Sequence, residues 1–84
     1  MASSLLRIPG VGKVIAEDLH ELGLNHIEQL VGRDPEALYH ELIKLQGEPV
    51  DHTVLYILRC AVYYAETPLE HRDPAKLKWW NWRD

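Results

Sequence analysis

The stretch that decides the fold is LLRIPGVGKVIAEDL, residues 5–19. Gly10 and Gly12 separate two runs of apolar residues, and two helices that meet across so tight a turn need glycine, because the backbone there takes dihedral angles that a Cβ atom disfavours. Val11, between the glycines, is expected to fill a small core within the hairpin, and Ala16 lets the two helices approach closely. The stretch therefore predicts a helix, a hairpin turn and a second helix.

Turn signals divide the N-terminal half into short helices on either side of this turn. Helices are predicted through Leu5, Leu6 and Ile8 with Ser4 as the N-cap, from about Gly12 to Leu22 with Gly23 just past its end, and over Ile27–Val31. The hairpin motif covers about residues 5–22.

The clearest helix start in the chain is Asp34-Pro35, an N-cap followed by proline at the first helical position. From there Leu38, Leu42 and Leu45 are expected to line a core face as far as Gly47. Further predicted elements are a long helix opened by Pro49, with Asp51 and His52 in its first turn and Pro68 at its end, and a final turn from Asp73-Pro74.

The stretch Val54–Ala65 contains a single charge, Arg59, and a helix that is apolar nearly all round is normally central in its domain. Nothing in the chain alternates with the period of two expected for strands. We therefore expect an all-α fold, a compact bundle of five or six short helices forming a single domain over residues 1–84.

This long helix also carries a polar stripe at helical spacing. The stripe is either a narrow solvent-facing edge with its tyrosine rings packed flat, or a partner-binding face centred on Arg59. Periodicity alone does not separate the two interpretations. Its members are His52, Tyr56, Arg59, Tyr63 and Glu66.

The hairpin turn predicts a phosphate-binding site. The turn is expected to leave the N–H groups of about Gly10, Gly12 and Lys13 unpaired at a helix N-terminus, where the helix dipole favours an anion. Lys13 adds a mobile positive charge, and Arg7 is the other basic residue nearby. Such a site binds the nucleic-acid backbone and reads no base edges.

The hairpin resembles the helix-hairpin-helix motif of DNA-binding and DNA-repair proteins, which has the form apolar-x-Gly-apolar-Gly. The resemblance implies that Gly10, Val11, Gly12 and Lys13, with Arg7, contact a DNA phosphate. The chain departs from the motif two and three residues after the second glycine. Many strongly binding members have Lys and Thr or Ser there, and this chain has Val14 and Ile15, which we expect to pack.

The following stretch, Leu22-Gly23-Leu24 with Ile27 and Leu30, looks like the shorter second half of a tandem pair. The resemblance therefore implies a tandem helix-hairpin-helix (SAM-like) architecture.

Five stretches are distributed over nearly the whole chain: Ile8–Lys13, Asp34–Tyr39, Val54–Tyr56, Arg59–Tyr63 and Leu77–Trp82. Through these stretches the chain resembles bacterial pathogenicity-locus or mitomycin-resistance proteins. That resemblance implies the same fold, a link to DNA and, as a third hypothesis, binding of an aromatic drug or of its DNA adduct.

The C-terminal basic, tryptophan-rich segment, residues 73–84, is a candidate auxiliary site. Basic residues interleaved with aromatic rings can stack on the bases of a single strand. The alternative is that the tryptophans fold back to cover the core, because an exposed cluster of that size would be a sticky patch. The residues concerned are Lys76, Lys78, Trp79, Trp80, Trp82 and Arg83.

Charge and composition exclude several functional classes. The chain has 84 residues and a formal net charge of -4, which excludes a polybasic DNA-coating protein. The N-terminus does not read as a signal peptide and no apolar run is long enough to span a membrane, so we expect a cytoplasmic protein.

No histidine pair has the spacing of a helical zinc site. The one cysteine, Cys60, lies in the apolar run without a visible base.

We therefore expect neither a metal, a cofactor nor catalysis. The first functional hypothesis is weak, sequence-independent DNA binding through the hairpin turn, although Glu17, Asp18 and Glu21 would repel a duplex that faced them. The second is a protein-interaction or oligomerisation module that uses the hairpin fold as a scaffold. The sequence leaves the oligomeric state and any protein partner open.

Overall fold

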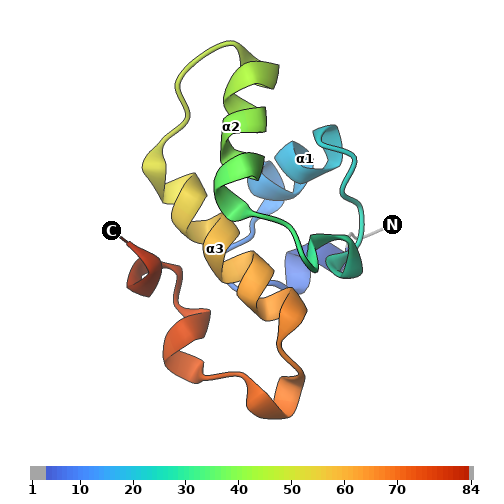
Figure 1. The fold of residues 1–84 in the computed structure, drawn as a ribbon, viewed down its shortest axis with the longest axis vertical. Helices are drawn as coiled ribbons and strands as arrows, with labels where there is room; N and C mark the ends of the chain where they lie inside the picture. Colours follow the sequence, from blue (N-terminus) through green and yellow to red (C-terminus); the bar gives the residue numbers. More distant parts are fainter. Residues whose placement is uncertain (1–3, 84) are drawn as a thin grey trace.

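The chain is all-helical in a computed structural model that describes residues 4–83 (Figure 1). Within these residues there are no strands. The α-helices are α1 (Lys13–Glu21), α2 (Pro35–Gln46) and α3 (His52–Glu66), and the 3-10 turns are η1 (Ser4–Arg7), η2 (Ile27–Leu30), η3 (Leu69–His71), η4 (Pro74–Leu77) and η5 (Trp79–Trp82).

The short segments expected as helices are therefore 3-10 turns. Each has three or four residues, too few to establish the i to i+4 hydrogen bonds of an α-helix. The first of them is also not capped as expected. The Ser4 hydroxyl instead accepts a hydrogen bond from the Ile27 N–H at 3.3 Å, which ties η1 to η2.

Side-chain caps explain where α2 and α3 begin. The Asp34 carboxylate accepts a hydrogen bond from the Glu36 N–H at 3.0 Å, and Pro35 occupies the first helical position, as the sequence predicted. The Asp51 carboxylate accepts from the Thr53 N–H at 2.8 Å, and this bond holds the pKa of Asp51 below its usual value. At its other end, α2 stops at Gly47, whose φ is 69°.

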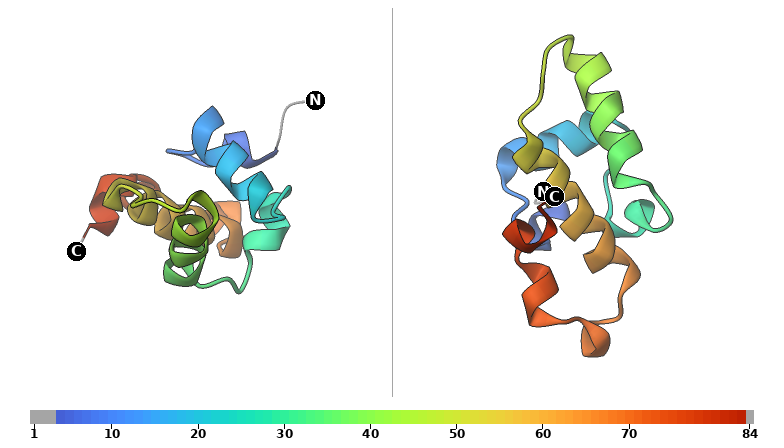
Figure 2. Two further views of the ribbon diagram at one scale, coloured as in Figure 1. Left: turned by 90° about the horizontal axis from the view of Figure 1, so that it is seen from above. Right: turned by 60° about the vertical axis from the view of Figure 1, so that its left-hand side comes forward.

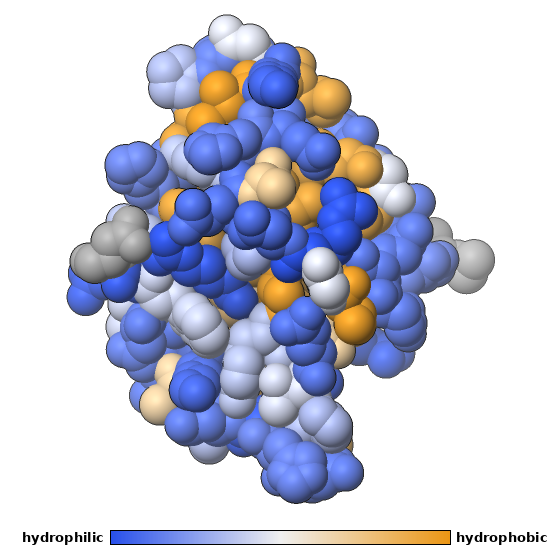
Figure 3. Space-filling view, viewed as in Figure 1, coloured by the Kyte–Doolittle hydropathy of each residue, from blue (hydrophilic) through white to orange (hydrophobic). Residues whose placement is uncertain are grey.

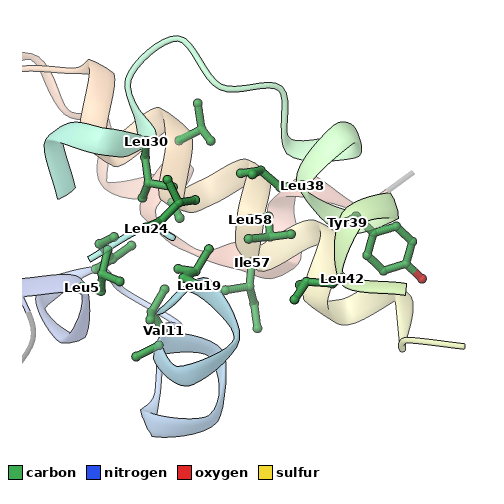
Figure 4. Close-up of a cluster of buried hydrophobic side chains, with 14 of the residues drawn as sticks. Leu5, Val11, Leu19, Leu24, Leu30, Leu38, Tyr39, Leu42, Ile57 and Leu58 are labelled. Atoms are coloured by element: carbon green, nitrogen blue, oxygen red, sulfur yellow. The ribbon is translucent and has the colours of Figure 1, made fainter. Parts of the chain in front are cut away.

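Helix α3 lies at the centre of the molecule, as its apolar run predicted. It contacts α2, η2, η4 and η5, and Leu58 and Ala61 are completely buried. Side chains from η1, the hairpin turn, α1, η2 and α2 converge on it in one continuous core (Figure 4). The core therefore fixes the hairpin against the rest of the chain.

One expected core residue lies outside this core. Leu38 and Leu42 are completely buried, but Leu45 is 54% exposed. Leu45 belongs to the last turn of α2, at the upper end of the molecule (Figure 1), where Ile43 still packs against the core. No described helix is long and apolar enough to cross a membrane.

Candidate nucleic-acid interface

The hairpin turn, residues 8–12, is built around two buried side chains. Ile8 and Val11 are 1% and 5% exposed, and the Val11 N–H donates to the Ile8 carbonyl oxygen at 3.0 Å. Val11 thus fills the core of the hairpin as predicted. Because the apolar side chains point inwards, the backbone on the other side of the turn faces solvent.

The two glycines of the turn have different roles. Gly10 has φ +86°, a left-handed conformation that L side chains rarely adopt. Gly12 has φ -94° and ψ -172°, an extended conformation open to any residue, and a Cβ atom added there would meet nothing within 4 Å. The expectation that both glycines relieve backbone strain is therefore wrong for Gly12. Its missing side chain instead leaves open space in front of the turn.

That open space lies beside unpaired N–H groups. The first hydrogen bond of α1 runs from the Ala16 N–H to the Gly12 carbonyl oxygen, at 2.9 Å. Among residues 4–83, the N–H groups of Gly10, Gly12 and Lys13 have no hydrogen-bond acceptor. They lie at or just before the N-terminus of α1, where the helix dipole is positive. Arg7 and Lys13 are exposed on either side of the turn.

The two residues at which the chain departs from the strongly binding pattern behave differently from each other. Ile15 is partly buried and packs against the core, as expected. Val14 is 70% exposed, so the expectation that it packs is wrong. It belongs to the first turn of α1, beside Lys13, and gives this part of the surface an apolar element.

The C-terminal segment, described over residues 73–83, lies against the hairpin turn (Figure 2, right). A Cβ atom added to Gly10 would lie 3.0 Å from Cδ1 of Trp79. The Sγ atom of buried Cys60 lies 3.5 Å from the Lys76 carbonyl oxygen and 4.0 Å from that of Pro9. Burial raises the pKa of this thiol. The hairpin, α3 and the C-terminal segment thus meet at one place.

Polar contacts hold the C-terminal segment on the stripe of α3. The Arg59 guanidinium donates to the Trp82 carbonyl oxygen at 2.7 Å and lies 3.4 Å from the Glu36 carboxylate. The Tyr63 hydroxyl accepts from the Asp73 N–H at 2.8 Å. The Tyr63 and Trp82 ring centroids are 5.6 Å apart.

The chain's own C-terminal segment therefore contacts the centre of this stripe. Tyr56 lies beside that centre, with its ring centroid 5.8 Å from the Arg59 guanidinium carbon.

The three tryptophans are arranged differently. Trp79 is partly buried and packs against the core, and Trp82 is partly buried with its Nε1–H donating to the Lys76 carbonyl oxygen at 2.7 Å. Trp80 is 47% exposed, and its ring meets that of Trp79 edge-on with 5.7 Å between the centroids. Two rings fold back onto the chain and the third is presented to solvent. Lys78 is exposed on the same segment.

Charge is divided unevenly between this region and the rest of the molecule. Residues 4–13 and 73–84 carry five Lys or Arg and two Asp, whereas residues 14–72 carry eleven Asp or Glu and four Lys or Arg. The net charge of -4 therefore conceals a cationic surface, which we define as the hairpin turn with Arg7 and Lys13 together with the C-terminal segment. An anionic ligand would approach the molecule there.

The C-terminal end of α1, at the other end of the helix from the hairpin turn, borders a groove. A shallow groove runs between α1 and the last turns of α2, and apolar surface is exposed towards this upper end of the molecule (Figure 3). Asp18 is beside it and accepts from the Gln46 side-chain amide at 3.1 Å. Partial burial, with the charges of Glu21 and Glu17, raises the pKa of Asp18. The groove is lined by Glu21, Leu22, Glu41, Lys44 and Leu45.

The structure brings together residues that sequence reasoning treated as separate sites. Arg7, Lys13 and the basic, tryptophan-bearing segment form one surface, through a contact between Gly10 and Trp79 that no sequence pattern signals. The groove was not predicted either, since Leu45, one of its two apolar lining residues, was assigned to the core. Within the described residues, no three His, Cys, Asp or Glu side chains are grouped as a metal site would require.

Comparison with known proteins gives matches of two kinds. DNA polymerase IV of Saccharolobus solfataricus and that of Sulfolobus acidocaldarius are each 32% identical to the chain over 66 residues. The matched region is 79% of the chain but 17% of each polymerase, so the chain spans about a sixth of the length of these curated relatives. No solved structure matches significantly. The model of one family, described as Pathogenicity locus (Cdd1), matches residues 1–84. The chain therefore belongs to the Cdd1 pathogenicity-locus family.

Proposed function

We propose that the chain is a non-catalytic DNA-binding module that holds a backbone phosphate at the hairpin turn, weakly and without regard to sequence. The observation that carries the proposal is the open space at Gly12 beside the unpaired N–H groups of Gly10, Gly12 and Lys13. Unpaired N–H groups and a positive helix terminus together form a phosphate site. The 32% identity to regions of two DNA polymerases supports DNA as the source of that phosphate.

The proposed architecture is a tandem helix-hairpin-helix. The first hairpin consists of η1, residues 8–12 and α1. The second begins at Gly23, with φ +85°, and continues through η2 and Gly32, with φ +79°, into α2. The hydrogen bond between Ser4 and Ile27 ties the two together. In this architecture the second hairpin supports the first, and the first contacts DNA.

The balance of charge explains why the proposed binding is weak. The cationic surface would contact the DNA, while the nearby acidic residues of α1, Glu17, Asp18 and Glu21, oppose binding, since Glu17 lies one helical turn from Lys13. With Lys13, Arg7 and the lysines of the C-terminal segment, we expect about two or three phosphates to be neutralised, which corresponds to a salt slope of about -2 to -3.

Fluorescence anisotropy with a labelled duplex, measured over a salt series, tests the proposal. The wild type is compared with Lys13→Glu and with Lys44→Glu, which makes the same charge change in the groove on the other side. We expect Lys13→Glu to weaken binding about tenfold and to reduce the magnitude of the salt slope by about 1. Lys44→Glu should change both quantities little. Circular dichroism confirms that each variant folds. Equal losses in the two variants would show that only net charge matters and would overturn the site.

The groove between α1 and α2 supports a second candidate function, the docking of a protein. Its lining includes Leu22 and the exposed Leu45 together with Glu21, Glu41 and Lys44, so it combines apolar contact with charge selection. Sedimentation velocity over a concentration series tests the simplest case, self-association. In that case Leu45→Glu shifts an oligomeric wild type to monomer, whereas a wild type that is monomeric at every concentration contradicts it.

A further inference from the structure

We propose that the hairpin turn and Trp80 form one composite surface for single-stranded DNA, with a phosphate at the turn and a neighbouring base stacked on the Trp80 ring. The inference rests on the proposed function and adds to it the kind of strand that is preferred. It requires three properties of Trp80: a position beside the phosphate site, an accessible ring and a fixed backbone.

Trp80 is connected to the turn through a chain of ring contacts. The Trp79 ring packs on Gly10, within the turn, and holds the Trp80 ring edge-on at 5.7 Å between centroids. Two residues further along the turn, Gly12 provides the open space and the unpaired N–H group. The Trp80 ring is thus separated from the turn by one intervening ring, that of Trp79.

The Trp80 ring is accessible and its surroundings are basic. It is 47% exposed, whereas Trp79 and Trp82 are turned inwards. Lys78 and Arg83 flank it in the sequence, both exposed, and the C-terminal segment contains one acidic residue among those described, Asp73. An aromatic ring among cations is the arrangement that binds single strands, because each base has a face to stack and each nucleotide a phosphate to neutralise.

Several hydrogen bonds fix the backbone that carries the ring. The Arg83 Nε–H donates to the Trp80 carbonyl oxygen at 3.0 Å, and the Asn81 N–H donates to that of Lys78 at 3.0 Å. The Asn81 side-chain amide reaches the Ala75 carbonyl oxygen at 2.7 Å. A ring held in this way is positioned before a base arrives, so stacking requires little further ordering.

The position of the ring favours a single strand over a duplex. In a duplex the bases are stacked on one another and do not present their faces to an outside ring, whereas the bases of a single strand can be splayed out. A duplex would therefore use only the phosphate site. A single strand would use the phosphate site and Trp80 together.

Three labelled ligands of equal length separate these contributions: an oligothymidylate, an abasic strand with the same phosphates, and a duplex. For the wild type we expect the oligothymidylate to bind more tightly than the abasic strand. Trp80→Ala should weaken oligothymidylate binding by about 5-fold or more, the effect of losing one stacked base. The same variant should leave abasic-strand and duplex binding unchanged. Trp80→Phe should restore part of the affinity.

Leu69→Ala provides the matched control, because Leu69 is a 75% exposed apolar residue in another 3-10 turn, η3, outside the cationic surface. It should change none of the three affinities. If Trp80→Ala binds oligothymidylate as the wild type does, or if the abasic strand binds equally well, the composite surface is overturned while duplex binding through Lys13 still stands. If none of the ligands binds at low salt, the proposed function fails as well.

Discussion

The hairpin and the C-terminal segment contribute to the same cationic surface, but they are attached to the molecule in opposite ways. The hairpin is held by apolar burial, with Leu5 and Leu19 completely buried and Ile8 1% exposed. None of the side chains in η3, η4 or η5 is fully buried. The C-terminal segment is instead held mainly by polar and aromatic contacts, among them the hydrogen bond from Arg59 to Trp82, and only Trp79 packs against the core.

Because of this difference, the hairpin and the C-terminal segment should open at different free energies. Apolar burial is lost only when the core itself comes apart, whereas a few hydrogen bonds to an exposed segment can open locally at a lower free energy. Both regions are ordered in the folded protein, but the C-terminal segment should open at a lower free energy than the hairpin.

Removing a core contact of the hairpin should have the largest effect. Leu19→Ala leaves a cavity in the core and is expected to lower the free energy of unfolding by about 2–5 kcal/mol, much of the stability of so small a domain. Urea denaturation followed by circular dichroism measures it. A loss below about 1 kcal/mol would show that apolar burial does not fix the hairpin in place.

Substitution of each glycine in turn tests the contact between the two regions. Gly10→Ala places a side chain at φ +86° and 3.0 Å from Trp79, so we expect a loss of about 1–2 kcal/mol with displacement of the C-terminal segment. Gly12→Ala meets neither obstacle and should change stability much less. Thermal unfolding of both variants gives the comparison, and equal losses would contradict the different roles assigned to the two glycines.

Loosening the C-terminal segment should lower the free energy of unfolding by a smaller amount. Arg59→Ala removes the hydrogen bond to the Trp82 carbonyl oxygen, and we expect about 1 kcal/mol of destabilisation. Hydrogen exchange should become faster at residues 73–83 while Leu19 and its neighbours in α1 keep their protection. If protection falls uniformly across the chain, the segment is not a separately detachable unit.

The smallest effect concerns the charge of Asp18 in α1, which accepts a hydrogen bond from Gln46 of α2. The pKa of Asp18 is raised in the folded state, so stability is lost as the pH rises through that pKa. Asp18→Asn keeps an oxygen for the Gln46 amide and should raise stability at neutral pH by about 0.3 kcal/mol, a small value because solvent screens this side chain. The gain should vanish below about pH 3.8, the ordinary value for the carboxyl. A gain that is constant with pH would rule out an electrostatic origin.

Local chemistry made much of the fold predictable. The Asp34-Pro35 start and the Gly47 end of α2 are set by neighbouring residues, and so are the cap of α3 at Asp51 and the packing of Val11. The 3-10 turns were expected as helices because the same start signals serve both. How long each turn becomes depends on tertiary contacts, which the local start signals do not contain.

The features that the sequence predicted wrongly or not at all are set by contacts between residues far apart in the chain. Leu45 has core spacing within α2 but is 54% exposed, because spacing within one helix does not say which part of that helix other elements cover. The contact between Gly10 and Trp79 joins residues far apart in the chain, and the sequence around each gives no sign of the other. The phosphate-site hypothesis followed from a local motif, whereas the composite surface required the fold.

The most direct test of the cationic surface is a titration of the ¹⁵N-labelled protein with a short DNA, followed by amide chemical shifts. We expect the largest shifts at Gly10, Gly12 and Lys13, with smaller shifts over residues 76–83 and none around the groove at Leu22 and Leu45. Shifts that concentrate at the groove, or a spectrum that DNA does not change at low salt, would contradict the account.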